Sequence, residues 1–241
     1  MGFTKVIDLS HPLRPGREAR RLEIERIDAT QITGAAADPS LQKGHSDGTE
    51  AWYIMHRVEM DNHIGTHMEA PYHALEGAAD LAQVPVEQFV GEAAVLDLRG
   101  YTAGQAIPLD AVQRAAEQVG GIGKDDIVFC MTGWSQYYDS EQYDEPPFLT
   151  REAVHWLVSR GIKMLGVDTR GSMDPAFPDR QNHLPLFEAG IVYIENLTNL
   201  PILREAMRHL DAVPESRVTA VALPPAVEGL EGFPVRVVTL L

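Results

Sequence analysis

Histidines and one carboxylate are concentrated in the segment Asp61-Asn62-His63-Ile64-Gly65-Thr66-His67-Met68-Glu69-Ala70-Pro71-Tyr72-His73. Its three histidines and Glu69 are spaced four, two and four residues apart. His63 and His67 could share one face of a helix, but Gly65 and Pro71 are poor residues for a helix interior. An extended segment fits better, because residues two apart in a strand point to the same side. We therefore expect His67 and Glu69 to face one cavity.

Imidazoles and a carboxylate that converge in this way suit a divalent ion such as Zn²⁺ or Mn²⁺. His63 and His73 would enter the same cavity from its two ends. A lone histidine is more often a surface residue or a core residue with satisfied hydrogen bonds. Four such groups at this density favour a metal site.

The composition predicts one soluble globular domain of 241 residues, with 44% hydrophobic and 23% charged residues and no internal repeat. A formal net charge of −15 argues against nucleic-acid or anionic-membrane binding, because both need a basic surface. The amino terminus lacks the long apolar run of a signal peptide and no later segment is long enough to cross a bilayer, so we expect a cytoplasmic protein. The single cysteine, Cys130, lies in an apolar run and is expected to be a buried structural thiol.

Strand and helix patterns alternate along the chain, which predicts an α/β domain. Apolar runs predict strands over 6–10, 52–60, 93–98, 127–131, 163–168, 192–195, 219–223 and 235–240. Helical spacing predicts helices near 109–119 and 151–160, the second capped by Thr150, and Pro85 begins a short one. The sequence contains no phosphate-binding loop, dinucleotide fingerprint or G-x-S-x-G elbow at a strand–helix turn.

Residues 14–50 differ in composition from the rest of the chain. The first part is strongly charged and the second is rich in small and polar residues, including Gly34, Pro39, Gly44 and Gly48. We expect a loop-like insertion, either a lid or partner-contacting arm or a disordered surface segment.

A second segment with chemical potential runs from Asn182 to Leu197. Glu195 ends an apolar strand, which is an unfavourable place for an unpaired charge. His183 precedes Pro185 in a predicted turn, where its ring would be free to project. Each residue alone would be a weak candidate.

Together these segments resemble the metal-dependent cyclase-like hydrolases, a family that includes bacterial kynurenine formamidase and isatin hydrolase. The family hallmark H-x-G-T-H-x-D-x-P-x-H matches residues 63–73, and its later His and Glu, twelve apart, match His183 and Glu195. Shorter similarities occur at 8–10, 132–134 and 232–236, so the resemblance covers most of the chain outside 14–50. It implies one domain over 1–241, built on a partly open β-barrel-like mixed sheet flanked by helices, and a homodimer or a multiple of it.

The resemblance also implies roles for individual residues. His63 and His67 would ligate one metal, Glu69 and Glu195 would be shared carboxylates, and His183 would ligate a second metal. His73 would be the general acid and base. The family usually has Asp at the position of Glu69, and the longer side chain gives the carboxylate a further rotatable bond. We expect one or two divalent ions per chain, with one held tightly.

The implied reaction is hydrolysis of an amide, lactam or lactone carbonyl of a small aromatic or cyclic molecule by metal-activated water. Trp52, Tyr72 and Trp134 could form an aromatic wall for that molecule, although core packing explains each of them equally well. Packing is also the favoured role of Thr66. Two alternatives stay open: a cyclase, isomerase or dehydratase that uses the same site, and a binding protein in which the metal is structural.

Overall fold

The computed structural model describes residues 5–27, 55–171, 174, 176, 183–208 and 217–241. The chain divides into two compact units, Met1–Pro12 with Gly65–Leu241, and Leu13–Ile64. The larger unit contains a nine-stranded mixed sheet and, among the described residues, the four α-helices of the chain. The predicted α/β architecture is therefore confirmed.

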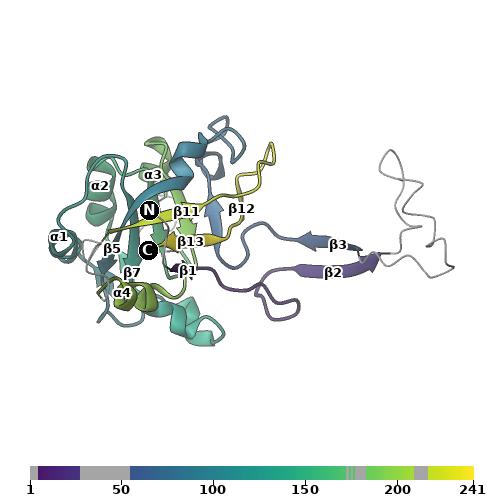
Figure 1. Cartoon of the computed structure of the whole chain (residues 1–241), viewed down its shortest axis with the longest axis horizontal. Coiled ribbons are helices and arrows are strands. Elements are labelled where there is room, and N and C mark those ends of the chain that lie inside the picture. The colour runs from purple at the N-terminus through teal and green to yellow at the C-terminus, as the bar shows by residue number, and fades with distance from the viewer. Residues whose placement is uncertain (1–4, 28–54, 172–173, 175, 177–182, 209–216) are drawn as a thin grey trace. The chain divides into compact units, whose positions relative to one another are not determined.

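Spatial order in the large sheet differs from chain order. From edge to edge its strands are β1 (Val6–Asp8), β13 (Val237–Leu240), β11 (Arg217–Ala222), β5 (Val90–Asp97), β7 (Ile127–Met131), β9 (Met164–Val167), β10 (Val192–Glu195), β4 (His67–Glu69) and β12 (Gly232–Pro234). The central strands β5, β7, β9 and β10 are parallel, and every other pairing is antiparallel. The order runs from β1 to β12 without closing, and the sheet curls as a half-barrel, as expected (Figure 1).

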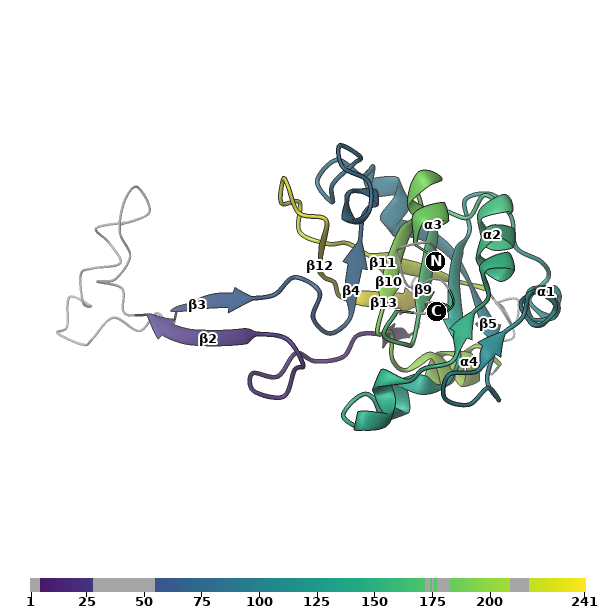
Figure 2. The same cartoon turned by 180° about the vertical axis from the view of Figure 1, so that it is seen from behind.

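Two hydrophobic clusters cover the two faces of this sheet. The alternation of side chains along β7 separates them: Phe129 belongs to one cluster, whereas Val128 and Cys130 belong to the other. The first cluster includes α4 (Leu200–Arg208), and the second includes α1 (Leu109–Gln118), α2 (Arg151–Ser159) and α3 (Leu184–Glu188). α1 and α2 lie side by side on the same flank of the sheet (Figures 1 and 2).

Local sequence explains where the two longer predicted helices begin and end. The hydroxyl of Thr150 accepts a hydrogen bond from Ala153 N at the start of α2, and this confirms the predicted cap. After α1, Gly120 takes a φ of 78° and Gly121 N donates to Ala116 O at 2.8 Å. Glycine adopts this left-handed backbone without strain, so it terminates the helix.

The Leu13–Ile64 unit contains an antiparallel pair, β2 (Leu22–Ile27) and β3 (Met55–Met60). The predicted insertion or arm thus includes a strand, β2. Two ion pairs link the two sides of this hairpin: Arg21, just before β2, pairs with Glu59 at 2.5 Å, and Arg57 pairs with Glu25 at 3.1 Å. The remainder of the predicted insertion, 28–50, lies outside the described residues.

Smaller elements complete the fold. A parallel pair joins β6 (Ala106–Ile107) to β8 (Phe148–Leu149), and 3₁₀ turns span Pro71–His73, Val86–Phe89, Trp134–Tyr137 and Glu141–Asp144. α3, α4 and β12 were not predicted from the sequence. Cys130 is buried as predicted, and burial raises the pKa of its thiol.

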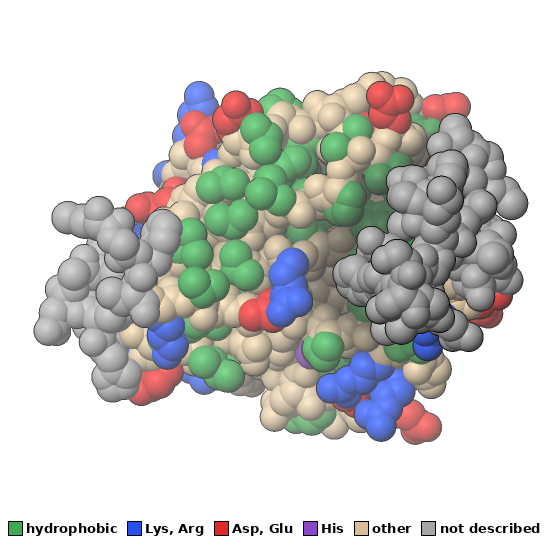
Figure 3. All heavy atoms as spheres, turned by 45° about the vertical axis from the view of Figure 1, so that its right-hand side comes forward, with side chains coloured by type: hydrophobic (Ala, Val, Ile, Leu, Met, Phe, Trp, Pro, Cys, Tyr) green, Lys and Arg blue, Asp and Glu red, His purple; other side chains and the backbone are tan. Residues whose placement is uncertain are grey.

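Charged side chains are mixed on the surface. On the face drawn in Figure 3, acidic and basic side chains lie next to each other in small groups among hydrophobic ones. Within the described part of the chain, no helix has both the length and the apolar character that a membrane span requires.

Candidate metal centre

The pairing of β4 with β10 brings the two predicted segments together. Glu195 lies directly opposite His67, and Tyr193 lies opposite Glu69. Met68 and Ile194 alternate to the other face, where both are fully buried in the core. His67, Glu69 and Glu195 therefore share the face that α3 covers. The extended conformation predicted for the histidine segment is found at His67–Glu69, whereas Pro71–His73 forms a 3₁₀ turn.

His183 reaches the same place from the start of α3. Its ring stacks on Phe187, with 5.9 Å between ring centroids, and meets the edge of Tyr193 at 5.0 Å. The side chain is 12% exposed. His183 lies in a turn, as predicted, and two aromatic side chains pack against its ring.

The two carboxylates alternate with the two imidazoles. Glu69 presents Oε1 to His67 Nε2 at 3.5 Å and Oε2 to His183 Nε2 at 4.0 Å. Glu195 lies on the other side, with Oε2 at 3.7 Å from His67 Nε2 and Oε1 at 3.7 Å from His183 Nε2. Each carboxylate thus offers one oxygen to each imidazole.

These separations fit shared coordination better than direct hydrogen bonding. Hydrogen bonds between nitrogen and oxygen measure about 2.7–3.2 Å. Two ligand atoms at about 2.0–2.1 Å from a tetrahedral zinc ion lie about 3.3 Å apart. Donor atoms of His67, Glu69 and Glu195 all lie within 4.8 Å of one another, and all three residues are buried. The donor set therefore suits a divalent cation.

The electrostatics of the centre also favour a positive charge. Burial alone would lower the pKa of His67, but Glu69 and Glu195 outweigh burial and raise that pKa above its ordinary value. Burial would also lower the pKa of His183, but Glu195 and Glu69 outweigh burial and raise that pKa. Two buried carboxylates are costly without positive charge nearby, which either a cation or protonated imidazoles can supply.

Hydrogen bonds behind the centre hold β4 in place. The ring nitrogen Nδ1 of His67 lies 2.9 Å from Gly65 O. Thr66 Oγ1 donates to Asn196 O at 2.5 Å and accepts from His11 N at 2.9 Å. The sequence favoured packing as the role of Thr66, but its hydroxyl makes two hydrogen bonds, one as donor and one as acceptor.

His73 lies at the more exposed side of the centre. Its Nε2 is 3.9 Å from Glu69 Oε1, and its side chain is 34% exposed. The ring meets the edges of His183 and Phe187 at centroid distances of 6.3 and 6.0 Å. Tyr72, the preceding residue, is 38% exposed.

Trp134 is a predicted site residue that the structure places outside this cluster. Trp134 is buried and donates from Nε1 to Tyr143 O at 3.3 Å, a placement that favours core packing over the predicted substrate wall. Trp52 lies outside the described residues. His63 belongs to the Leu13–Ile64 unit, so its role as a ligand stays a prediction.

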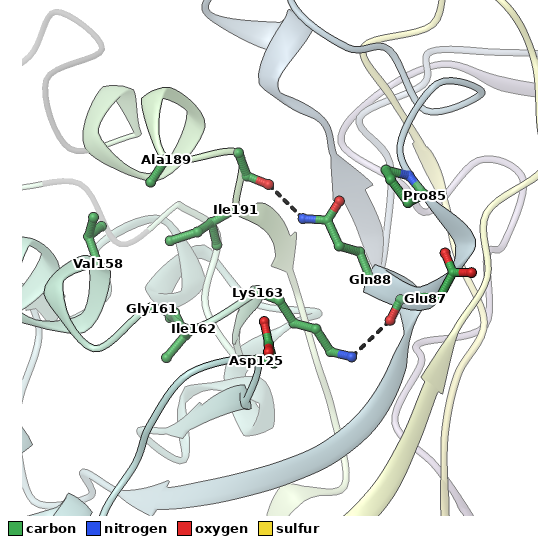
Figure 4. Close-up of a pocket in the computed structure, with 11 residues that line it drawn as sticks. Pro85, Glu87, Gln88, Asp125, Val158, Gly161, Ile162, Lys163, Ala189 and Ile191 are labelled. Atoms are coloured by element: carbon green, nitrogen blue, oxygen red, sulfur yellow. Dashed lines mark hydrogen bonds between the residues drawn. The ribbon is translucent and has the colours of Figure 1, made fainter.

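A separate cavity of about 620 Å³ lies at the other end of β10 (Figure 4). Its lining includes Lys163 and Ile191, which precede β9 and β10, whereas Glu195 ends β10. Lys163 Nζ donates to Glu87 O at 2.8 Å, and Gln88 Nε2 donates to Gly190 O at 2.7 Å. These polar groups bond to the backbone, so the cavity has no cluster of ligating side chains comparable to the metal centre.

Sequence reasoning missed three residues that shape the centre: Phe187, Tyr193 and Asn196. Tyr193 could have been found, because it stands two residues before Glu195 in a strand and must share its face. The contribution of Phe187 depended on recognising α3, and that of Asn196 on the pairing of β4 with β10.

Comparisons with known proteins agree with this geometry. The family model described as "Putative cyclase" matches residues 7–174. Kynurenine formamidase from Erythrobacter litoralis is 28% identical over 170 residues, which cover 70% of this chain and 68% of that protein.

Two solved structures share the fold. Isatin hydrolase A from Labrenzia aggregata, bound to benzyl benzoate, has a TM-score of 0.74 and 23% identity over 98% of this chain and 93% of its own. A protein from Bacillus stearothermophilus described as a predicted metal-dependent hydrolase has a TM-score of 0.69 and 25% identity over 98% of both chains. With a family model that spans more than half of its length and a fold shared from end to end, the chain belongs to the cyclase family.

Proposed function

We propose that the chain is a metal-dependent hydrolase that cleaves the amide, lactam or lactone carbonyl of a small aromatic or cyclic molecule. The observation that carries this proposal is the alternating arrangement of two carboxylates and two imidazoles at 3.5–4.0 Å. The curated relatives named kynurenine formamidase support an amide as the first substrate class to test.

His67, Glu69 and Glu195 would hold the tightly bound divalent ion, and His63 is proposed as a further ligand. His183 would orient the substrate or ligate a second, loosely bound ion. A cation in this place supplies Lewis acidity that polarises a carbonyl oxygen and makes water more acidic. We propose zinc or manganese, because imidazole and carboxylate ligands suit both. The residues give the centre a fixed shape, since Phe187 and Tyr193 orient the ring of His183 and β-sheet pairing aligns His67 with Glu195.

His73 is proposed to move the proton between attacking water and leaving group. Histidine suits this task because its ordinary pKa lies near neutral pH. The location supports the assignment: Nε2 is 3.9 Å from Glu69 Oε1, and the side chain remains partly open to solvent. A proton taken up beside the carboxylate can therefore be passed to the leaving group or to bulk water.

Tyr72 is the aromatic residue that we retain as a substrate contact, since it is exposed and adjacent to His73. We also propose that 1–241 acts as one functional domain and that the protein is a cytoplasmic homodimer or a multiple of it. The resemblance to the cyclase-like hydrolases implies the single domain and the oligomer.

The description of the family as a putative cyclase favours one second candidate, ring closure or isomerisation at the same centre. Product mass separates these reactions. The products of hydrolysis together exceed the substrate by one water, ring closure by dehydration loses one water, and isomerisation leaves the mass unchanged. A structural metal in a binding protein would instead give no turnover.

The test is a screen of the purified protein, supplemented with Zn²⁺ or Mn²⁺, against aryl formamides, cyclic imides, lactams and lactones. We expect turnover that chelation abolishes and that added metal restores. Cyclic imides, lactams and lactones should give a ring-opened product heavier by one water. Aryl formamides should give an amine and formate whose summed mass exceeds that of the substrate by one water. Full turnover in rigorously metal-free protein would refute the proposal.

A further inference from the structure

The carbonyl oxygen of Gly65 is shared by two donors behind the metal centre. His67 Nδ1 lies 2.9 Å from it, and Asn196 Nδ2 donates to it at 2.7 Å. A carbonyl oxygen can only accept hydrogen bonds, so Nδ1 of His67 must carry a proton. In the neutral ring the lone pair is then on Nε2, the atom that faces Glu69 and Glu195.

Asn196 is itself held on three sides. Its side chain accepts a hydrogen bond at Oδ1 from the Tyr143 hydroxyl at 2.7 Å. Its backbone makes two more: the carbonyl accepts from Thr66 Oγ1, and the N–H donates to Thr169 O at 3.0 Å. Because Gly65 O needs a donor, the amide can have only one orientation, with Nδ2 toward Gly65 and Oδ1 toward Tyr143. Asn196 and Tyr143 are both buried.

The backbone of Asn196 is specialised for this position. It follows Glu195 at the end of β10 and has a φ of 59°, a left-handed conformation that asparagine tolerates better than most residues. The turn carries the amide away from the strand and toward the start of β4. One residue therefore links the end of β10 to the carbonyl that orients His67.

We propose that Asn196, held by the Tyr143 hydroxyl, is a positioning residue that fixes the tautomer and orientation of His67 for metal binding. The inference rests on the proposed function. A histidine that binds a metal through one ring nitrogen commonly donates from the other to a carbonyl, and loss of such support costs about 10–100-fold in metal affinity or activity. In this chain the carbonyl itself is held in place by a second side chain.

The chain offers a matched control in Asn199. It has a φ of 58° and donates from Nδ2 to a backbone carbonyl, Asp8 O, at 2.9 Å. It therefore shares the backbone conformation and the bond type of Asn196, but its hydrogen bond does not involve Gly65. Asn196→Ala and Asn199→Ala make the same truncation without changing the charge of the chain.

The experiment measures the affinity of metal-free protein for Zn²⁺ alone, by competition with a chromogenic chelator, and needs no substrate. We expect Asn196→Ala to weaken zinc binding by about 10–100-fold and Asn199→Ala to change it by less than about twofold. Tyr143→Phe removes one hydroxyl and should weaken binding by a smaller factor. In the double variant, Tyr143→Phe should weaken zinc binding little beyond Asn196→Ala, because Asn196 Oδ1, the acceptor of the Tyr143 hydroxyl, is already absent.

The inference would be overturned if Asn196→Ala bound zinc within about threefold of the unmodified protein, or if Asn199→Ala lost as much affinity as Asn196→Ala. Either result would leave the proposed function standing. If Asn196→Ala fails to fold, an unchanged zinc affinity in Tyr143→Phe would overturn the inference in the same way. Unmodified protein that binds no zinc or manganese would overturn both proposals.

Discussion

Replacing Gly166 by alanine would put a methyl group into space that the core already fills. A Cβ atom there would lie 2.7 Å from Leu197 Cδ1 and 2.8 Å from Phe129 Cδ1. Both neighbours are fully buried. Carbon atoms pack best at about 3.5–4.0 Å, so these side chains would have to move by roughly 0.7–1.3 Å.

The expected cost follows from two opposing effects. Overpacking of a core destabilises a protein by about 1–3 kcal/mol. Replacing a flexible glycine restricts the unfolded chain, which offsets about 0.4–1 kcal/mol of that cost. We expect a net loss of about 1–2 kcal/mol in the free energy of unfolding, and a fall in Tm of roughly 2–8 °C.

Equilibrium urea unfolding of Gly166→Ala measures this loss, and Gly123→Ala is the matched control. A Cβ at Gly123 would meet no atom within 4 Å, and Gly123 is not in the left-handed region. The control should therefore be as stable as the unmodified protein, or more stable by up to about 1 kcal/mol. The packing argument fails if Gly166→Ala and Gly123→Ala prove equally stable.

Three further predictions concern the site and its surroundings. His73→Asn should lower turnover by about 10²–10⁴ while most metal stays bound, whereas His155→Asn, on the exposed face of α2, should leave turnover unchanged; an equal rate in both would exclude His73 as the proton carrier. Metal titration of the unmodified protein should saturate near one equivalent per chain, and Glu69→Asp should strengthen a second binding event. If the unmodified protein bound two metal ions per chain equally tightly, the prediction of one tight site would be wrong. Burial raises the pKa of Asp168 from 3.8 to about 6, so the folded chain binds more protons than the unfolded chain between those values. The stability that this protonation contributes is fully present below about pH 4 and is lost as the pH rises through about 6, and Asp168→Asn should remove that slope. A slope of the opposite sign would show that the hydrogen bonds to Asp168 from Thr132 and Gly133 outweigh burial.

Local sequence determined the elements that carry the centre. Gly65 and Pro71 exclude a helix through the histidine segment, and the two-residue period of a strand puts His67 and Glu69 on one side. The predicted strand at 127–131 coincides with β7, and the cap predicted at Thr150 begins α2. α4 was within reach of the same reasoning, since Pro201 stands in its first turn and Leu200, Leu203 and Met207 recur at helical spacing.

The resemblance to a known family, and no rule of local structure, linked the histidine segment to His183 and Glu195. The order of polar and apolar residues along one strand does not show which strand it pairs with or in which register. A shift of one residue between β4 and β10 would turn Glu195 away from His67. In the observed register, Met68 and Ile194 are buried on one face of the sheet, and Glu195 meets His67 on the other face.

Only the tertiary structure decided how the site residues are held. The ring of His183 is oriented by Phe187 and Tyr193, which come from a helix and a strand that meet only in the folded chain. Asn196 reaches Gly65 across the β4–β10 pair, a contact of residues 131 positions apart. Sequence patterns report the local periods of strand and helix, whereas such contacts arise when the whole chain satisfies its buried polar groups and fills its core at once.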